Sequence, residues 1–144
     1  MRAARALGKV GTSAQTGVPD LINALKDTDQ DVQISAAEAL LLIDPSVKDA
    51  VAVLINALDN GKSDVQIHAA AALGNIGPGA AEAVSGLIHA LKDKNYNVRA
   101  KAAFALGKIG KAARVAEPEL TKLLQDQNEL PRKSAALALS ELRK

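Results

Sequence analysis

The chain has 144 residues and a formal net charge of +2, and only 1% of its residues are aromatic although 48% are hydrophobic. A chain whose apolar content is mainly Ala, Leu, Ile and Val suits close helix–helix packing, which favours an all-α fold. The near balance of charge argues against a dedicated nucleic-acid-binding protein. The lack of cysteine excludes disulfides and thiolate metal sites, and no apolar run is long enough for a membrane-spanning helix.

A register of 33 residues runs through the chain. Leu54 follows Leu21 at this spacing, Leu87 and Leu120 continue the series, and no insertion interrupts it. A second column of leucines keeps the same register at Leu7, Leu40, Leu73, Leu106 and Leu139. An internal period of this length is typical of repeat proteins. The sequence therefore predicts one repeat domain over 1–144, with a partial repeat at 1–17 and repeats at about 18–50, 51–83, 84–116 and 117–144.

The first predicted element is a single helix at about 1–10, which has no partner helix. It is not a secretory signal, because no apolar stretch follows its basic residues, and we expect a cytoplasmic protein. The apolar side of this helix is covered only in part, whereas the ends of repeat arrays normally need polar caps. We therefore expect either that the chain is a fragment of a longer array or that this end self-associates.

Four helical hairpins are predicted next, at about 18–44, 51–77, 84–110 and 117–143. In the first of them, Val18, Leu21 and Leu25 lie on one helical stripe, and a second stripe runs through the segment 31–43. A lone hairpin of this size cannot bury its apolar stripe, but stacked hairpins can. The pattern therefore predicts an α-solenoid of stacked antiparallel helical hairpins.

The repeat resembles a known family. The segment VSGLIHALKD at 84–93 resembles the first helix of the HEAT-like repeat of the phycobilisome-lyase (PBS lyase) type, and NVRAKAAFALGKIG at 97–110 resembles its second helix and stop. The resemblance covers essentially the whole chain. It implies a right-handed, HEAT/armadillo-like superhelix whose second helices line the concave face. The fold alone does not specify function, because the same repeat occurs in lyase subunits and in scaffolds.

The resemblance also concerns the turns between paired helices. An arginine common in the family, matched here by Arg99 and Arg132, can bridge to acidic turns nearby. Gln33 and Gln66 stand at that position in the first two hairpins. We therefore expect weaker ion pairing in the turns there.

A candidate partner-binding surface follows from helical geometry, since residues opposite the core stripe of each second helix face outward. The candidates are Arg2, Arg5, Lys9, Ile34, Glu38, Ile67, His68, Lys101, Phe104 and Lys108. Positive charge prevails among them, so we expect a basic concavity with Ile34, Ile67 and Phe104 as an apolar strip, suited to an acidic protein partner. The alternative is that Ile34 and Ile67 pack against neighbouring repeats and that the basic residues only keep the surface soluble.

No catalytic, metal or cofactor site is expected. His68 and His89 are predicted on different helices and on opposite faces, and neither is followed by Glu. Gly61, Lys62 and Ser63 resemble the end of a phosphate-binding loop, but Asn56 stands where its first glycine belongs. The chain is therefore not expected to be an enzyme.

Three functions remain open from the sequence. The leading one is a protein-interaction scaffold that binds its partner on the concave face. The second is a non-catalytic or chromophore-holding subunit of a bilin lyase-type complex. The third is weak nucleic-acid binding, which the scarcity of stacking aromatics disfavours because Tyr96 and Phe104 are the only candidates.

Overall fold

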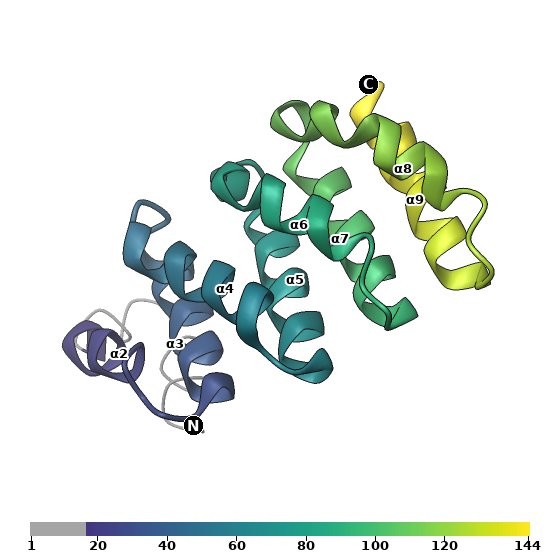
Figure 1. Cartoon of the computed structure of the whole chain (residues 1–144). Coiled ribbons are helices and arrows are strands. Elements are labelled where there is room, and N and C mark those ends of the chain that lie inside the picture. The colour runs from purple at the N-terminus through teal and green to yellow at the C-terminus, as the bar shows by residue number, and fades with distance from the viewer. Residues whose placement is uncertain (1–16) are drawn as a thin grey trace.

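The computed structural model describes residues 17–144, and within them the chain forms helices and no strand (Figure 1). Four pairs of helices follow one another: α2 (Val18–Ala24) with α3 (Gln30–Ile43), α4 (Lys48–Asn60) with α5 (Ser63–Ile76), α6 (Val84–Ala90) with α7 (Tyr96–Ile109), and α8 (Glu117–Leu123) with α9 (Glu129–Leu142). Two 3₁₀ helices, η2 (Gly77–Ala83) and η3 (Lys111–Ala116), lead into α6 and α8. The predicted all-α fold of stacked hairpins is confirmed. The helix predicted at 1–10 lies outside the described residues.

Local sequence explains where the second helices begin and end. Asp29 precedes α3 and accepts a hydrogen bond from the backbone N–H of Asp31, and Asn95 caps α7 in the same way through Asn97, both at 2.8 Å. Helices α5 and α7 stop at Gly77 (φ 74°) and Gly110 (φ 83°), whose left-handed conformation favours glycine. Helix α3 ends instead at Asp44, before a turn in which Ser46 donates to the Asp44 carboxylate.

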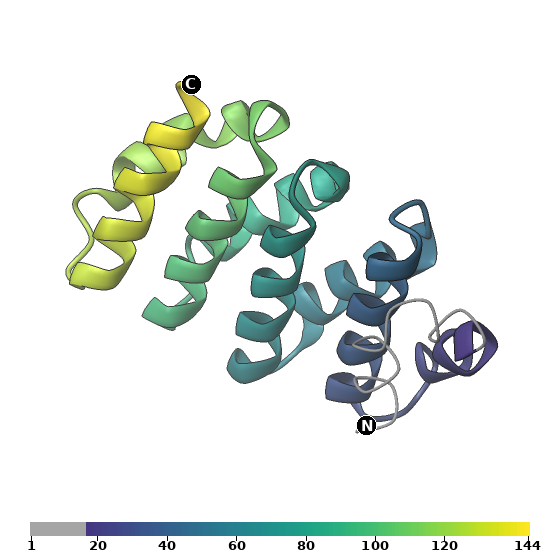
Figure 2. The ribbon, with the colours of Figure 1, turned by 180° about the vertical axis from the view of Figure 1, so that it is seen from behind.

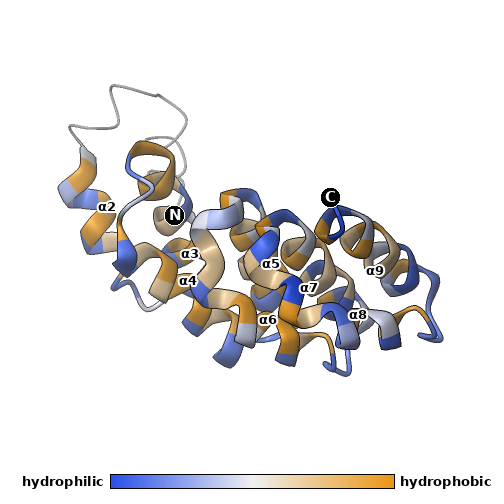
Figure 3. Cartoon of the chain, turned by 90° about the horizontal axis from the view of Figure 1, so that it is seen from above, coloured by the Kyte–Doolittle hydropathy of each residue, from blue (hydrophilic) through white to orange (hydrophobic). Residues whose placement is uncertain are grey.

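The helices form two layers, with α2, α4, α6 and α8 in one and the row of α3, α5, α7 and α9 in the other (Figures 1 and 2). Between the layers, one leucine column from each is buried in every described repeat: Leu21, Leu54, Leu87 and Leu120 from the first helices, and Leu40, Leu73, Leu106 and Leu139 from the second. The turn between α8 and α9 is mostly hydrophilic (Figure 3). Within 17–144, none of the helices combines the length and apolar character that crossing a membrane requires.

From α5 through α7 to α9, neighbouring second helices approach one another more closely than neighbouring first helices do. Glycine makes this approach possible, because a Cβ on Gly107 of α7 would lie 2.9 Å from the Cα of Ala138 on α9. A Cβ on Gly74 of α5 would likewise lie 3.1 Å from the Cα of Ala105 on α7. Since the second-helix layer is the more tightly spaced of the two, the array bends toward it. The outer surface of the second helices is therefore the concave one.

The junction between α3 and α5 differs from the others. Leu41, which is buried, occupies on α3 the position that Gly74 and Gly107 occupy on α5 and α7. A leucine there occupies the space into which a neighbouring backbone would otherwise move. Accordingly α3 and α5 pack less closely than α5 with α7 or α7 with α9 (Figure 2).

Substituting Gly107 tests the close approach. We expect Gly107→Ala to lower the free energy of unfolding by about 1–3 kcal/mol, because the new methyl group meets the backbone of α9. The matched control is Gly86→Ala in α6, where the added Cβ would meet only side-chain ends of Asp59 and Leu58, at 3.3 and 3.4 Å. The control should be neutral or stabilising by up to about 1 kcal/mol, as helix propensity favours alanine. Urea unfolding of both variants gives the comparison, and a stabilised Gly107→Ala protein would contradict this packing.

Candidate functional site

The outward stripe of the second helices forms one surface, which we call the second-helix face. On α7 it consists of Asn97, Lys101, Phe104 and Lys108, and the residues 33 positions before and after them continue it over the other helices. These are Asp31, Ser35, Glu38 and Leu42 on α3, Asp64, His68, Ala71 and Asn75 on α5, and Leu130, Ser134, Leu137 and Glu141 on α9. Of these, Ser35 is buried, although it shares the register. The predicted site residues Arg2, Arg5 and Lys9 lie outside the described part of the chain.

The apolar strip expected on this face is wrong in part. Ile34 is 0% exposed and belongs to the core, so it cannot meet a partner. Ile67 is only partly buried but packs against the same core. The reason is that a second helix in a stack packs in three directions, against its own first helix and against both neighbouring second helices. Position 34 and its equivalents on α5 and α7 point toward a neighbour, as the alternative interpretation proposed, whereas Lys133, the equivalent on α9, is exposed.

The remaining predicted residues are distributed along the face. Glu38 and His68 lie together where α3 meets α5, while Lys101, Phe104 and Lys108 lie together on α7. Sequence reasoning missed Asp31 and Asp64, which belong to the first turns of α3 and α5. The signal was present, because the same 33-residue register that places Lys101 on this stripe also places Asp31 there. The part of the face that the structure describes is therefore not uniformly basic.

Lys101, Phe104 and Lys108 form a basic–aromatic cluster. The Lys101 Nζ lies 5.3 Å from the centre of the Phe104 ring and the Lys108 Nζ lies 5.7 Å from it. Each is within reach of a cation–π attraction, worth about 0.5–1 kcal/mol at an exposed site. The ring itself is half-buried because it rests over Gly74 of α5, where a Cβ would come within 2.9 Å of the ring. Within residues 17–144, no carboxylate pairs with either lysine.

His68 bridges two helices. Its Nε2 lies 3.4 Å from a Glu38 carboxylate oxygen, and its Nδ1 lies 3.6 Å from an Asp31 carboxylate oxygen. The interaction with Glu38 raises the pKa of His68 above its ordinary value of 6.5; partial burial acts in the opposite direction, and the Asp31 carboxylate adds to the increase. The cluster of Asp31, Glu38 and His68 thus links α3 to α5 at the junction where glycine-mediated contact is missing. Among residues 17–144, no group of three or more His, Cys, Asp or Glu side chains is arranged to hold a metal ion.

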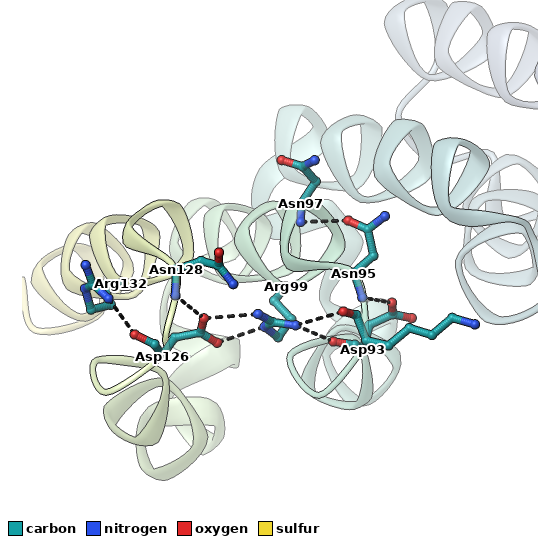
Figure 4. A network of polar contacts seen from close by, with 8 residues as sticks. Asp93, Asn95, Asn97, Arg99, Asp126, Asn128 and Arg132 are labelled. Carbon is teal, nitrogen blue, oxygen red and sulfur yellow. Dashed lines mark hydrogen bonds and ion pairs between the residues drawn. The ribbon is translucent and has the colours of Figure 1, made fainter.

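Arg99 joins the turns of two repeats on a different side of the array (Figure 4). Its guanidinium donates two hydrogen bonds to the Asp126 carboxylate, at 2.8 and 3.0 Å, and a third to the backbone carbonyl of Asp93 at 2.8 Å. Burial on its own raises the pKa of Asp126, but the bonds from Arg99 and from the Asn128 backbone outweigh it, so the pKa of Asp126 is lowered. Arg132 donates to the Asp126 carbonyl in the equivalent way, at 2.7 Å.

The two glutamines keep only part of this arrangement. Gln33 donates to the carbonyl of Asp27, and Gln66 donates to that of Leu58 at 3.1 Å. Each side chain therefore bonds within its own turn, but it carries no charge with which to pair with the following turn. The expected difference in turn ion pairing between the first two hairpins and the third is confirmed.

Stacked two-layer hairpins in an unbroken register define the class of α-solenoid proteins. A family model for HEAT repeats matches residues 1–61, 18–93 and 84–144, which together span the chain. The chain belongs to the HEAT repeat family. No characterised protein matches its sequence closely enough to count as a relative.

Solved structures with the same fold include natural and engineered proteins. An engineered protein is 30% identical, with a TM-score of 0.69 over 98% of this chain and 72% of that one. Another engineered protein is 32% identical, with a TM-score of 0.64 over 89% of this chain and 38% of that one. The complex of CpcE and CpcF of phycocyanin lyase from Nostoc sp. PCC7120 matches with a TM-score of 0.72 at 22% identity, over 95% of this chain and 86% of that one. At that identity the last comparison concerns the fold alone.

Replacing Arg99 with the glutamine of the earlier repeats tests the link between turns. Arg99→Gln should lower the free energy of unfolding by about 1–3 kcal/mol, because a charged, partly buried hydrogen-bonding partner of Asp126 is lost. Arg143→Gln, at the exposed end of α9, is the control for loss of one positive charge and should stay within about 0.5 kcal/mol of the wild type. Urea unfolding measures both, and equal values for the two variants would contradict a stabilising role for the pair.

The His68 cluster predicts a pH dependence of stability. Because the pKa of His68 is raised in the folded protein, its contribution is complete below the unfolded value of 6.5 and is lost as pH rises through the folded value. His68→Gln should therefore destabilise the protein at about pH 6 and much less at about pH 9. His89→Gln removes the other histidine, exposed on α6, and serves as the control for loss of one imidazole at both pH values. Urea unfolding at the two pH values measures the difference, and an NMR titration of the ring protons measures the pKa of His68. A His68 pKa below 6.5 would contradict a stabilising link between His68 and the two carboxylates.

Proposed function

We propose that this protein is a non-catalytic interaction module that binds another protein on its second-helix face. The observation that carries the proposal is the basic–aromatic cluster of Lys101, Phe104 and Lys108. An aromatic ring with charged neighbours on a concave surface is a common form of binding hot spot. Membership of the HEAT repeat family supports a scaffold built for contact with other macromolecules.

Exposed apolar groups extend the cluster toward α9. Leu137 stands at the position equivalent to Phe104 and is 70% exposed, and Leu130 on the same stripe is 47% exposed. Both lie on the tightly spaced part of the array, where the glycine contact holds α9 against α7. A partner segment can therefore place aliphatic side chains on α9 and carboxylates beside Lys101 and Lys108. This arrangement supports an acidic partner for the α7 part of the face.

We infer no catalytic role for the second-helix face. Both ring nitrogens of His68 face carboxylates, so neither is directed at a hydroxyl or thiol that it could activate. Lys101 and Lys108 are exposed, and their ammonium groups lie over the Phe104 ring. Exposed lysines of this kind attract and position a charged ligand.

A second candidate is a chromophore-holding or accessory subunit of a bilin lyase-type complex. It is favoured by the likeness in fold to the phycocyanin lyase complex of CpcE and CpcF. Mixing the protein with a free bilin tests it directly, since a bound bilin shows a shifted and enhanced absorption band. An unchanged spectrum would reject this candidate.

The protein-binding proposal predicts which variant loses its partner. Lys101→Glu combined with Phe104→Ala should raise the dissociation constant at least about tenfold, because removing a central aromatic anchor commonly costs more than 1 kcal/mol. The matched control is Lys111→Glu combined with Val115→Ala, which makes the same kinds of change at exposed positions of η3.

The experiment captures partners with all three proteins side by side and then measures affinity for each purified candidate. A partner held by the wild type and the control, and lost by the α7 double variant, is the expected result. A partner lost equally by both variants, or retained by both, would place the binding site elsewhere. Adding duplex DNA and single-stranded RNA at physiological salt to a gel-shift assay tests nucleic-acid binding with the same variants.

A further inference from the structure

Charge on the second-helix face is divided along the array rather than mixed. Asp31, Glu38 and Asp64 bring three carboxylates to the outward stripes of α3 and α5, around His68. The next helix, α7, presents Lys101 and Lys108 and no acidic group on its stripe. On α9 the stripe exposes Leu130 and Leu137, and its one carboxylate, Glu141, pairs with Lys144 at 3.1 Å. In the order of the helices, the unpaired charge on the described face is therefore acidic on α3 and α5 and basic on α7, and α9 adds two exposed leucines; Leu42 on α3 is exposed as well.

We propose that this division makes the face directional, so that it binds a partner segment of complementary polarity in one orientation. The segment would carry Lys or Arg over α3 and α5, Asp or Glu over α7, and an aliphatic side chain over α9. This inference rests on the proposed function and adds to it the chemistry of the partner segment and the orientation in which that segment binds.

The carboxylates that would receive the basic end are accessible. The side chain of Asp31 is 53% exposed and that of Glu38 is 33% exposed, and Asp64 is exposed as well. His68 faces two of these groups from α5, so even when it is protonated its single charge balances only part of theirs. On α7 no carboxylate among the described residues offsets either lysine. Both ends of the charge pattern are thus available to a partner.

The geometry fits a short extended segment. Packed helices lie about 8–10 Å apart, so three steps from α3 to α9 span roughly 27 Å. An extended chain advances about 3.3 Å per residue, so about eight residues cross the four helices. A segment of this length reaches both charged regions at once. It must do so if the face is to distinguish the two orientations of the segment.

Electrostatic complementarity of this kind selects orientation more than it adds affinity. Exposed ion pairs each contribute little, because solvent and salt screen them. A reversed segment, however, would set its carboxylates against Asp31 and Glu38 and its basic groups against Lys101 and Lys108, and juxtaposed like charges are penalised. The difference between the two orientations therefore exceeds what either set of pairs contributes alone.

The test uses the whole chain, labelled with ¹⁵N, and a peptide of about ten residues with lysines at one end and glutamate and leucine at the other. A nitroxide label at the lysine end broadens nearby amide signals. A second peptide with the reversed sequence covers the opposite chain direction. With the wild type, the peptide that binds more tightly should broaden amide signals in α3 and α5. The affinity of this peptide should fall as salt is added.

The matched variant exchanges the charges of the two regions: Asp31→Lys and Asp64→Lys with Lys101→Glu and Lys108→Glu. All four positions are exposed, so the variant is expected to retain its helical circular dichroism. The broadening should then move to α7 and α9. A control that exchanges charge off the face and also keeps the net charge, Glu82→Lys with Lys94→Glu, should leave the wild-type pattern unchanged.

The outcomes separate the two proposals. Broadening that is equal at both ends of the face, or that does not move in the charge-exchanged variant, would overturn the directional inference while leaving binding to the face intact. If neither peptide perturbed the amides of the second helices in the wild type, the proposed binding function of this face would fail with it.

Discussion

The close approach of α5, α7 and α9 is the constraint on which the rest of the structure depends. Glycine at positions 74 and 107 lets each second helix come into contact with the backbone of the next, so this layer is more tightly spaced than the layer of first helices. Tight spacing on one side bends the array toward that side. It also affects which side chains remain outside, because residues such as Ala100 and Ala103 on α7, which face a neighbouring second helix, are buried. What remains is a single outward stripe per helix, and the candidate site lies on it.

Where the glycine is missing, other interactions replace it. At the α3–α5 junction, Leu41 keeps the helices apart, and His68 reaches across to Asp31 and Glu38 on the concave side. At the α7–α9 junction the helices touch directly, and Arg99 with Asp126 ties the turns together. The first link can be weakened by loss of a proton, whereas the second persists because arginine stays charged at any ordinary pH. The two junctions therefore respond differently to the solution around them, although they come from copies of one repeat.

The fold could be predicted from the sequence because its information is periodic. A leucine that returns every 33 residues without a gap identifies the hairpin, and stacking follows from the apolar stripe that a single hairpin cannot bury. The site could be predicted only in part. Lys101, Phe104 and Lys108 share the outward face as expected, but Ile34 is buried. Helical periodicity identifies the stripe that faces the helix's own hairpin partner, and it does not say which remaining directions face solvent and which face the next repeat. That distinction depends on how neighbouring second helices pack against one another, which the periodicity of a single helix does not describe.

For a related reason, the summed charge of the outward residues does not describe how charge is arranged on the candidate surface. A sum over outward residues treats them as one region, whereas the stacking of repeats arranges them in order along the array. Asp31 lies in the first turn of α3 and, like other first-turn carboxylates, suits the positive end of the helix. Yet its place in the register also brings it to the same stripe as Lys101, two helices away. A residue can therefore stabilise its own helix and at the same time set the sign of the surface that the helix presents. In a repeat protein the order of the charges along the stack, rather than their total, determines what a bound segment meets.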